Sequence, residues 1–342
     1  MKILIVALLI SFLFSLALAS PNPSSSNITL GSSLTASLDG PSYLLSPSGT
    51  FAFGFKSLDP NNADQYKIGI WIANSTDTLF TWVPNPDHDE PIDKGSSMQL
   101  NNSGVFMLRK LGFKEEVLLN VTDPVFSASI LDNGNLVLFG NDSNIIWQSF
   151  DHPTDTIVEG QILKSGEYLS TEVSPLYHIT MTVDGNLVLE RQTVVQWWNH
   201  WGQQEDYQWS VHWNSKTVNK GSRVVLKLDR DGRLYLVDWN LNVIKNFTKG
   251  EEKQVAGRTI YRATMDSDGI FRVYGERMGS EEDRKSVVLW EAPCLRCQKK
   301  QTLINVAIIV SCVIVSLAII ICFFYWCCRR EMLLGNAAVR WI

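Results

Sequence analysis

The sequence predicts an all-β fold, arranged as tandem threefold prisms and followed by a single transmembrane helix. Three observations predict it: a turn-and-strand pattern recurs six times, no long stretch of helical period appears outside the two ends of the chain, and apolar segments occupy those ends. Charged residues make up only 19% of the 342 residues and the net charge is -5, so the composition does not favour nucleic-acid binding.

The repeated unit is a small or polar residue, a glycine, any residue, and then a run with alternating apolar positions. Glycine tolerates a positive φ, Asp-Gly and Asn-Gly favour hairpin turns, and the β-branched and aromatic residues that follow suit a half-buried strand. The six copies are Pro47–Phe53, Asn102–Leu108, Asp132–Leu138, Val183–Leu189, Arg230–Leu236 and Ser267–Val273.

Six copies suggest two groups of three. Three hairpin-based sheets can close around a shared axis so that their inward side chains form one core. A Pro-bearing stretch at Asp151–Gly160 separates the third copy from the fourth. We therefore predict one domain over residues 28–155 and a second, diverged one over 156–292.

The first apolar segment has the features of a secretory signal peptide. Met1-Lys2 is followed by the apolar run Ile3–Leu18, and Ala17-Leu18-Ala19 offers a small-x-small cleavage site. We predict a signal peptide over residues 1–19; the alternative is an uncleaved anchor.

The second apolar segment, residues 302–326, contains no Asp, Glu, Lys or Arg. At 1.5 Å per residue its length is about 37 Å, enough to span a bilayer. The signal peptide would place the middle of the chain outside, which predicts a single-pass type I protein of the plasma membrane. Residues 293–301 would form a juxtamembrane stalk, and residues 327–342 a cytoplasmic tail too short for a domain.

Cysteine and sequon positions agree with this topology. Only Cys294 and Cys297 lie outside the membrane segment and its cytoplasmic end, so the ectodomain has no disulfide framework; this pair suits a local disulfide or a covalent dimer. Cys327 and Cys328 are either palmitoylated or reduced cytosolic thiols. We expect no metal and no cofactor. The Asn-x-Ser/Thr sequons, predicted N-glycosylation sites, start at Asn27, Asn74, Asn101, Asn120, Asn141 and Asn246.

Four segments carry a family resemblance. Phe51–Phe55 (FAFGF) and Lys67–Trp71 (KIGIW) are similar to two family strands, and Thr81–Asp87 resembles the segment VWVANRD with two proline departures. Ile146–Thr156 is similar to the signature WQSFDHPTDT. The chain resembles the bulb-type lectin domains of plant G-type lectin (S-domain) receptor-like kinases, which implies the β-prism II fold. The resemblance is good over residues 28–163 and weaker from there to Trp290.

The resemblance implies a mannose site with the pattern Gln-x-Asp-x-Asn-x-Val-x-Tyr, whose polar side chains would bond sugar hydroxyls while valine packs on the ring. No copy keeps all five residues. The fifth copy keeps Asp231, and the sixth keeps Asp268 and Tyr274 with Ile270 at the Asn position. Asp-Gly-Asn also makes a turn without any sugar, so a scaffold role stays open. The candidate carbohydrate-binding residues, from the third and fourth copies, are Asn133, Asn135, Val137, Phe139, Asp184, Asn186 and Val188.

A second candidate site is a tryptophan-rich cluster, which is either an aromatic platform for a partner or the packed edge of a sheet. It comprises Trp197, Trp198, Trp201, Trp209 and Trp213, with His200 and His212 among them.

No Gly-rich loop, His-Arg-Asp or Asp-Phe-Gly motif is present, so no kinase activity is expected. The favoured function is a membrane-anchored receptor-like lectin that recognises glycans or glycoproteins, mannose-type among them, and signals through a partner's kinase. A homodimer or a complex with S-domain receptor kinases would supply that partner. The alternatives are a truncated G-type lectin receptor kinase and a protein-interaction scaffold that binds no sugar.

Overall fold

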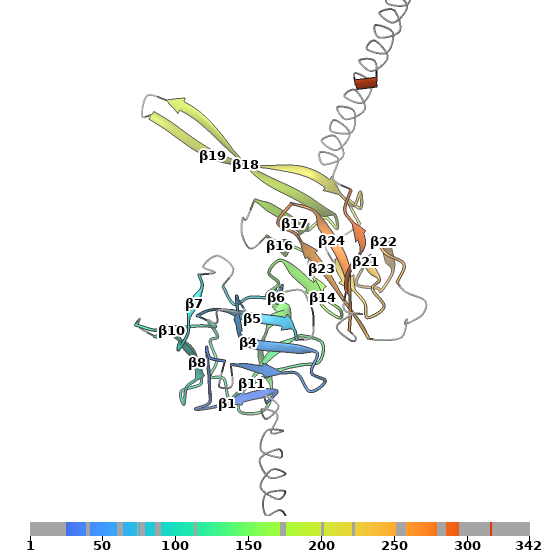
Figure 1. The fold of residues 1–342 in the computed structure, drawn as a ribbon. Coiled ribbons are helices and arrows are strands. Elements are labelled where there is room, and N and C mark those ends of the chain that lie inside the picture. Colours follow the sequence, from blue (N-terminus) through green and yellow to red (C-terminus); the bar gives the residue numbers. More distant parts are fainter. Residues whose placement is uncertain are drawn as a thin grey trace, which may run out of the picture. The chain divides into compact units, whose positions relative to one another are not determined.

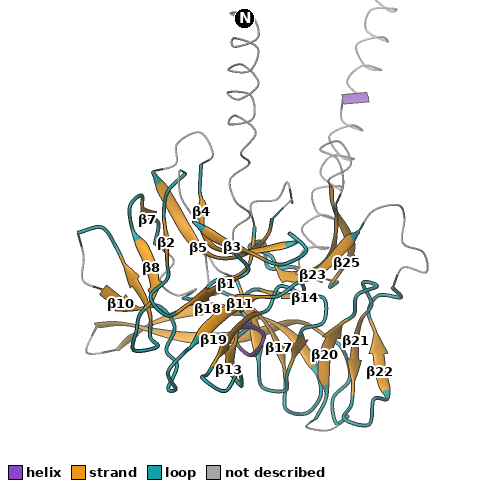
Figure 2. Ribbon diagram, turned by 90° about the horizontal axis from the view of Figure 1, so that it is seen from below, coloured by secondary structure: helices purple, strands orange, loops and turns teal. Residues whose placement is uncertain are grey.

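The structure is a computed structural model. It describes residues 25–38, 42–59, 64–73, 75, 79–85, 90–112, 115–171, 176–199, 202–220, 223–250, 258–278, 285–293 and 315–316. Strands and loops make up almost all of these residues, as Figure 2 shows, and the helical parts are a short 3-10 turn, η2 (Ser149–Asp151), and the pair Val315 and Ser316. The predicted all-β class is therefore confirmed.

In the part of the chain that the structure describes, the strands form six antiparallel sheets, and each sheet contains the strand that follows one of the six repeat turns. Three sheets are built from residues 27–148. They are β3 (Tyr43–Leu45), β4 (Phe51–Ser57), β5 (Gln65–Ile72) and β6 (Phe80–Trp82), with β7 (Ile92–Asp93) on β5; β10 (Glu115–Val117), β9 (Phe106–Arg109), β8 (Ser97–Leu100) and β2 (Ser33–Thr35); and β1 (Asn27–Thr29), β11 (Ser127–Ile130), β12 (Leu136–Phe139) and β13 (Ile145–Gln148).

The other three sheets are built from residues 156–291 (Figure 1). They are β16 (Tyr168–Ser170), β17 (Tyr177–Met181), β18 (Leu187–Asn199) and β19 (Gly202–Asn214); β15 (Ile162–Leu163), β20 (Val225–Leu228), β21 (Leu234–Val237) and β22 (Val243–Asn246); and β14 (Thr156–Val158), β23 (Thr259–Met265), β24 (Phe271–Arg277) and β25 (Lys285–Glu291).

The repeat turns form as the sequence predicts. The six repeat glycines, Gly49, Gly104, Gly134, Gly185, Gly232 and Gly269, all have φ between 71° and 87°. In the third copy the Gly134 N–H donates to the Leu131 carbonyl at 3.0 Å, and the Leu131 N–H donates to the Asn135 carbonyl at 2.9 Å. This left-handed conformation is what favours glycine there.

Among the described residues, two large hydrophobic cores lie inside the sheets, and a smaller cluster is formed by Ala52, Trp71, Phe80 and Val83. The first is rich in aromatic residues such as Phe51, Phe53 and Phe106, whereas the second is mainly aliphatic. Strand β14 contributes to both, since Val158 packs in the first core and its neighbour Ile157 in the second. A strand side-chain period of two explains this split.

The hairpin of β18 and β19 extends well beyond the other two strands of its sheet (Figure 1), and each of its strands has 13 residues. No helix among the residues described has the length and apolar character required to cross a bilayer. The predicted signal peptide and the predicted tail lie outside the described residues. The same holds for the predicted membrane span except residues 315–316, and for the predicted stalk except Pro293. The cysteines at 294, 297, 327 and 328 also lie outside the described residues.

Candidate functional site

In the third to sixth copies, the Asp or Asn that precedes the repeat glycine closes the turn. A side-chain Oδ1 accepts the backbone N–H two residues later in four copies: Asn133 from Asn135 at 3.1 Å, Asp184 from Asn186 at 3.3 Å, Asp231 from Arg233 at 3.1 Å and Asp268 from Ile270 at 3.0 Å. This is the Asx-turn geometry that these residues favour. Two predicted sugar contacts, Asn133 and Asp184, therefore also hold their own turns.

In the third copy, Asn135 lies inside a polar cluster at the end of the sheet. It is only 5% exposed. Its Oδ1 accepts from the Ser149 hydroxyl and the Phe150 N–H, both at 3.2 Å, and its Nδ2 donates to Gln148 Oε1 at 2.8 Å. The chain continues from Gln148 Nε2 to Asp151 Oδ2 at 2.8 Å. Both hydrogen-bonding groups of this amide thus have partners within the protein.

The fourth copy repeats the arrangement around Asn186, which is 6% exposed. Its Oδ1 accepts from the Ser215 hydroxyl at 2.8 Å and from the Thr217 N–H at 3.2 Å. The same hydroxyl in turn accepts the Leu187 N–H at 2.9 Å. In the third copy the Ser149 hydroxyl likewise accepts the Leu136 N–H at 3.0 Å. In both copies, therefore, the residue at the Asn position joins one strand end to the next.

The other candidate residues lie on the strands that follow these turns. Val137 and Val188 are buried and Phe139 is half-buried. Val188 pairs with Thr180 in β17 and with Asn214 in β19. The structure thus brings the candidates together within each copy, as Asn133, Asn135, Val137 and Phe139 on one sheet and Asp184, Asn186 and Val188 on another. Their sugar-binding role stays a prediction.

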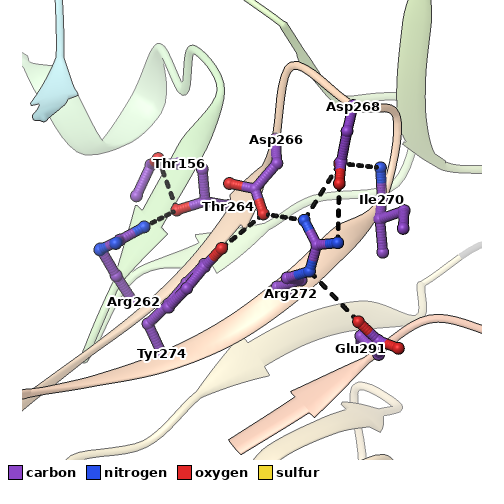
Figure 3. A network of polar contacts seen from close by, with 9 residues as sticks. All are labelled: Thr156, Arg262, Thr264, Asp266, Asp268, Ile270, Arg272, Tyr274 and Glu291. Carbon is purple, nitrogen blue, oxygen red and sulfur yellow. Dashed lines mark hydrogen bonds and ion pairs between the residues drawn. The ribbon is translucent and has the colours of Figure 1, made fainter. Parts of the chain in front are cut away.

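The sixth copy holds a network that our sequence reasoning missed (Figure 3). Arg272 stands at the valine position, and its Nη1 donates to Asp266 Oδ2 at 2.6 Å while its Nη2 donates to Asp268 Oδ2 at 2.8 Å. Its Nε donates to Glu291 at 3.3 Å, and the Tyr274 hydroxyl donates to Asp266 Oδ2 at 2.6 Å. The signal was present in the sequence as an aspartate at the Gln position and an arginine at the Val position.

Charge explains the stability of this arrangement. Partial burial lowers the pKa of Arg272, but the ion pairs with Asp268 and Asp266 outweigh that effect and raise it above the ordinary value. The guanidinium of Arg272 therefore bonds to the side chains at the Gln and Asp positions, which the family pattern would use to pair with sugar hydroxyls.

Alkaline titration gives a test of this network. Burial and the hydrogen bond to Asp266 raise the pKa of Tyr274 to about 12 from 10.0. Between these two values the unfolded chain loses the phenolic proton and the folded protein retains it, so stability falls as pH rises. Urea unfolding from pH 9 to 12 should show a shallower decline for Tyr274→Phe than for the parent, whereas parallel curves would contradict the assignment.

The fourth-copy sheet carries an aromatic stack on its outer face. The rings of Tyr168 and His178 lie 4.7 Å apart at 17°, and those of His178 and Trp209 lie 4.3 Å apart at 33°. Tyr168 is 51% and Trp209 42% exposed. Burial lowers the pKa of His178, which favours its neutral imidazole. Glu190 stands opposite His178 in the register and accepts from the Thr180 hydroxyl at 3.4 Å.

The predicted tryptophan cluster divides between two environments. Trp209 belongs to the exposed stack, whereas Trp213 packs against Phe247 and Trp290 at the edge of the second core. His212 Nε2 lies 3.3 Å from the Ser210 hydroxyl. His200 and Trp201 lie outside the described residues, as do the side chains of Trp197 and Trp198. Tyr168 and His178 complete the stack with Trp209. Because they come from other strands, the spacing of residues in the sequence could not identify them.

Among the sequons, Asn27, Asn120, Asn141 and Asn246 are exposed. Asn101 holds its turn by accepting the N–H groups of Ser103 at 2.9 Å and Val105 at 3.0 Å. Asn246 Oδ1 accepts from Arg233 Nε at 2.9 Å. Asn74 lies outside the described residues. Glycosylation of these positions stays a prediction.

Comparison with known proteins assigns a central part of the chain to a family. A family model described as D-mannose binding lectin matches residues 70–176. This chain contains a bulb-type lectin domain. Its relatives are G-type lectin S-receptor-like serine/threonine-protein kinases, of which LECRK3 and LECRK4 from Oryza sativa subsp. indica are 33% identical over 261 residues and 32% identical over 272 residues.

These matches cover 72% and 78% of the lectin chain but only 30% and 33% of the two kinases, so the chain spans about a third of the length of the curated relatives it matches. Among solved structures, a monomeric monocot mannose-binding lectin from Gastrodia elata is 20% identical, with 40% of this chain and 96% of that chain covered and a TM-score of 0.28.

Proposed function

We propose that this chain recognises carbohydrate at the cell surface, as the membrane-anchored ectodomain of a receptor-like lectin whose ligands are glycans or glycoproteins. The presence of a bulb-type lectin domain supports the class of ligand. The observation that carries the proposal is the exposed stack of Tyr168, His178 and Trp209 beside Glu190. Aromatic faces offered next to a few polar groups are typical of sugar sites.

The chemistry of this face favours a neutral pyranose. The ring faces of Tyr168 and Trp209 suit the apolar C–H face of a sugar, while the oxygens of Thr180 and Glu190 lie beside them to pair with hydroxyls. A neutral His178 adds no positive charge, and the Glu190 carboxylate opposes an acidic sugar. Mannose-type glycans satisfy these requirements.

A glycan array tests the proposal. We expect Trp209→Ala and Tyr168→Ala each to weaken binding by about tenfold, because each removes one stacking face. Trp239→Ala is the matched control, since Trp239 is 67% exposed and lies outside this sheet. Absence of binding at protein concentrations on the order of tens of micromolar, or equal loss in all three variants, would contradict a sugar site here.

The anchoring and signalling parts of the proposal rest on the sequence. We propose a type I topology with a signal peptide at residues 1–19 and a span at 302–326, and signalling through the kinase of a partner such as an S-domain receptor kinase, or through a homodimer. Protease protection of tags at the two ends of the chain tests the topology. A transcript whose reading frame continues past Ile342 into a kinase would instead favour a receptor kinase.

We also propose that residues 28–155 and 156–292 are two prism domains. The support is that three sheets use only residues 27–148 and three use only 156–291. Separate expression of the two segments tests this division, with cooperative unfolding expected of each. Failure of both to fold alone would argue for one obligate unit, consistent with the Val158 and Ile260 side chains in the first core.

A protein-interaction scaffold is the second candidate. Two observations favour it. The amide oxygens of Asn135 and Asn186 accept hydrogen bonds within the protein, and Arg272 bonds to the polar side chains of the sixth copy. The β18–β19 hairpin also exposes Val194, Tyr207 and Val211. Capture of a protein partner that deletion of the hairpin tip abolishes, without any glycan binding, would favour this function.

A further inference from the structure

A preformed cleft lies beside the segment that resembles the family signature. Trp82 and Trp147 meet edge to face with centroids 5.7 Å apart, and His152 stacks on Trp147 at 5.1 Å and 10°. Trp82 Nε1 donates to the His152 carbonyl at 2.8 Å, which fixes the two segments together. All three residues line a half-open cleft of about 280 Å³. The aromatic walls are therefore held in place without any ligand.

One wall of this cleft carries a buried hydroxyl that lacks a partner. Thr154 lines the cleft and is 8% exposed, and its Oγ1 has no hydrogen-bond partner among the described residues. Buried hydroxyls are ordinarily paired, because leaving one unpaired is unfavourable. A ligand whose polar atoms reach this hydroxyl would satisfy it.

The rim of the same cleft includes a sequon asparagine. Asn120 is exposed, lines the cleft, and is followed by Val121 and Thr122. A glycan attached to its Nδ2 would begin at the rim of the cleft.

We propose that this cleft holds the first N-acetylglucosamine of an N-glycan on Asn120. A pyranose ring has an apolar C–H face that can pack on the half-buried Trp147, and its hydroxyl and acetamido groups can pair with the Thr154 hydroxyl. The covalent link also gives the sugar a high effective concentration at the cleft. In the attachment step a lipid-pyrophosphate oligosaccharide is the donor: its anomeric C–O bond breaks, the C1–Nδ2 bond forms, the amide loses one proton, and the lipid pyrophosphate leaves.

This site is distinct from the aromatic face of the fourth-copy sheet, but the attached glycan rests on the proposed secretory topology. A glycan on Asn141 without one on Asn120 would count against the cleft and not against that topology. The Asn120 glycan would stabilise the first part of the chain and cover the cleft, whereas the face with Trp209 would stay open to external glycans.

The test uses the full chain from eukaryotic cells that attach high-mannose glycans. Thr122→Ala removes the sequon and leaves Asn120 intact, while Thr122→Ser retains the sequon. Asn141→Gln removes an exposed turn sequon that does not line this cleft and serves as the matched control. Hydroxyl-radical footprinting reports the accessibility of Trp147, and calorimetry reports Tm.

We expect Thr122→Ala to raise Trp147 oxidation several-fold and to lower Tm by about 3 °C, with Thr122→Ser and Asn141→Gln close to the parent. Trimming with an endoglycosidase that leaves one N-acetylglucosamine should change neither quantity. The proposal is overturned if Asn120 carries no glycan, if Thr122→Ala behaves like Asn141→Gln, or if trimming alone exposes Trp147.

Discussion

Replacing Glu276 with leucine is expected to lower the free energy of unfolding by about 3 to 5 kcal/mol, because it removes one member of a buried ion pair with Arg262. The two side chains are 4% and 3% exposed, with Arg262 Nε 2.8 Å from Glu276 Oε1. Arg262 also donates to the Thr264 hydroxyl at 2.8 Å and faces the Tyr274 ring at 3.9 Å.

The measurement is the midpoint of guanidinium chloride unfolding at constant m-value. The double variant Arg262→Met/Glu276→Leu should recover most of the loss, since it removes both charges together. Glu116→Leu is the matched control, because its ion pair with Lys110 is largely exposed and should change stability by less than about 1 kcal/mol. A double variant as unstable as the single one would show that packing, and not charge, decides the effect.

The sequence predicted those features of the fold that depend on neighbouring residues. The glycine of each turn and the alternation that follows it are local, so the six turn-and-strand units are evident without any structure. The hydroxyls that complete these units are not local. Ser149, Ser215 and Thr248 each accept a backbone N–H from a strand 13 to 28 residues away, and their role depends on the sheet register.

The candidate site was predicted less well for the same reason. The family pattern predicts sugar contacts by Asn135 and Asn186. The amide oxygens of these two residues accept hydrogen bonds from the hydroxyls of Ser149 and Ser215. The stack of Tyr168, His178 and Trp209 comes from three strands, and no spacing in the sequence marks it. Pattern matching located the repeats, while tertiary contacts decide which side chains of each repeat have partners.

The fourth and sixth copies differ in how many of their polar groups have hydrogen-bond partners within the protein. In the sixth copy, Asp266, Asp268 and Tyr274 all bond within the network around Arg272, which leaves few groups for a ligand. In the fourth copy, Glu190 lies beside exposed rings and pairs only weakly with Thr180. Ligand binding by a face needs groups that water occupies in the free protein, which is why we propose the fourth copy and not the sixth for recognition.

Substituting alanine for Gly232 should be strongly destabilising, by about 3 kcal/mol, for two additive reasons. Its φ of 79° disfavours any residue with a Cβ by about 1 kcal/mol or more. An added Cβ would also lie 2.6 Å from the Tyr261 ring, which is buried in the second core and cannot retreat without overpacking it.

Gly166→Ala separates these two effects. Gly166 has φ 89°, yet a Cβ there would meet nothing within 4 Å, so only the backbone term of about 1 kcal/mol is expected. Equal losses for the two variants in urea unfolding would show that the ring contact is unimportant. If Gly232→Ala loses more stability than Gly166→Ala, the same large loss is expected for Gly134→Ala, because an added Cβ there would lie 2.8 Å from the Phe51 ring. The repeat glycine would then be required for two reasons: the turn needs a positive φ, and an aromatic residue of an adjoining sheet packs against it.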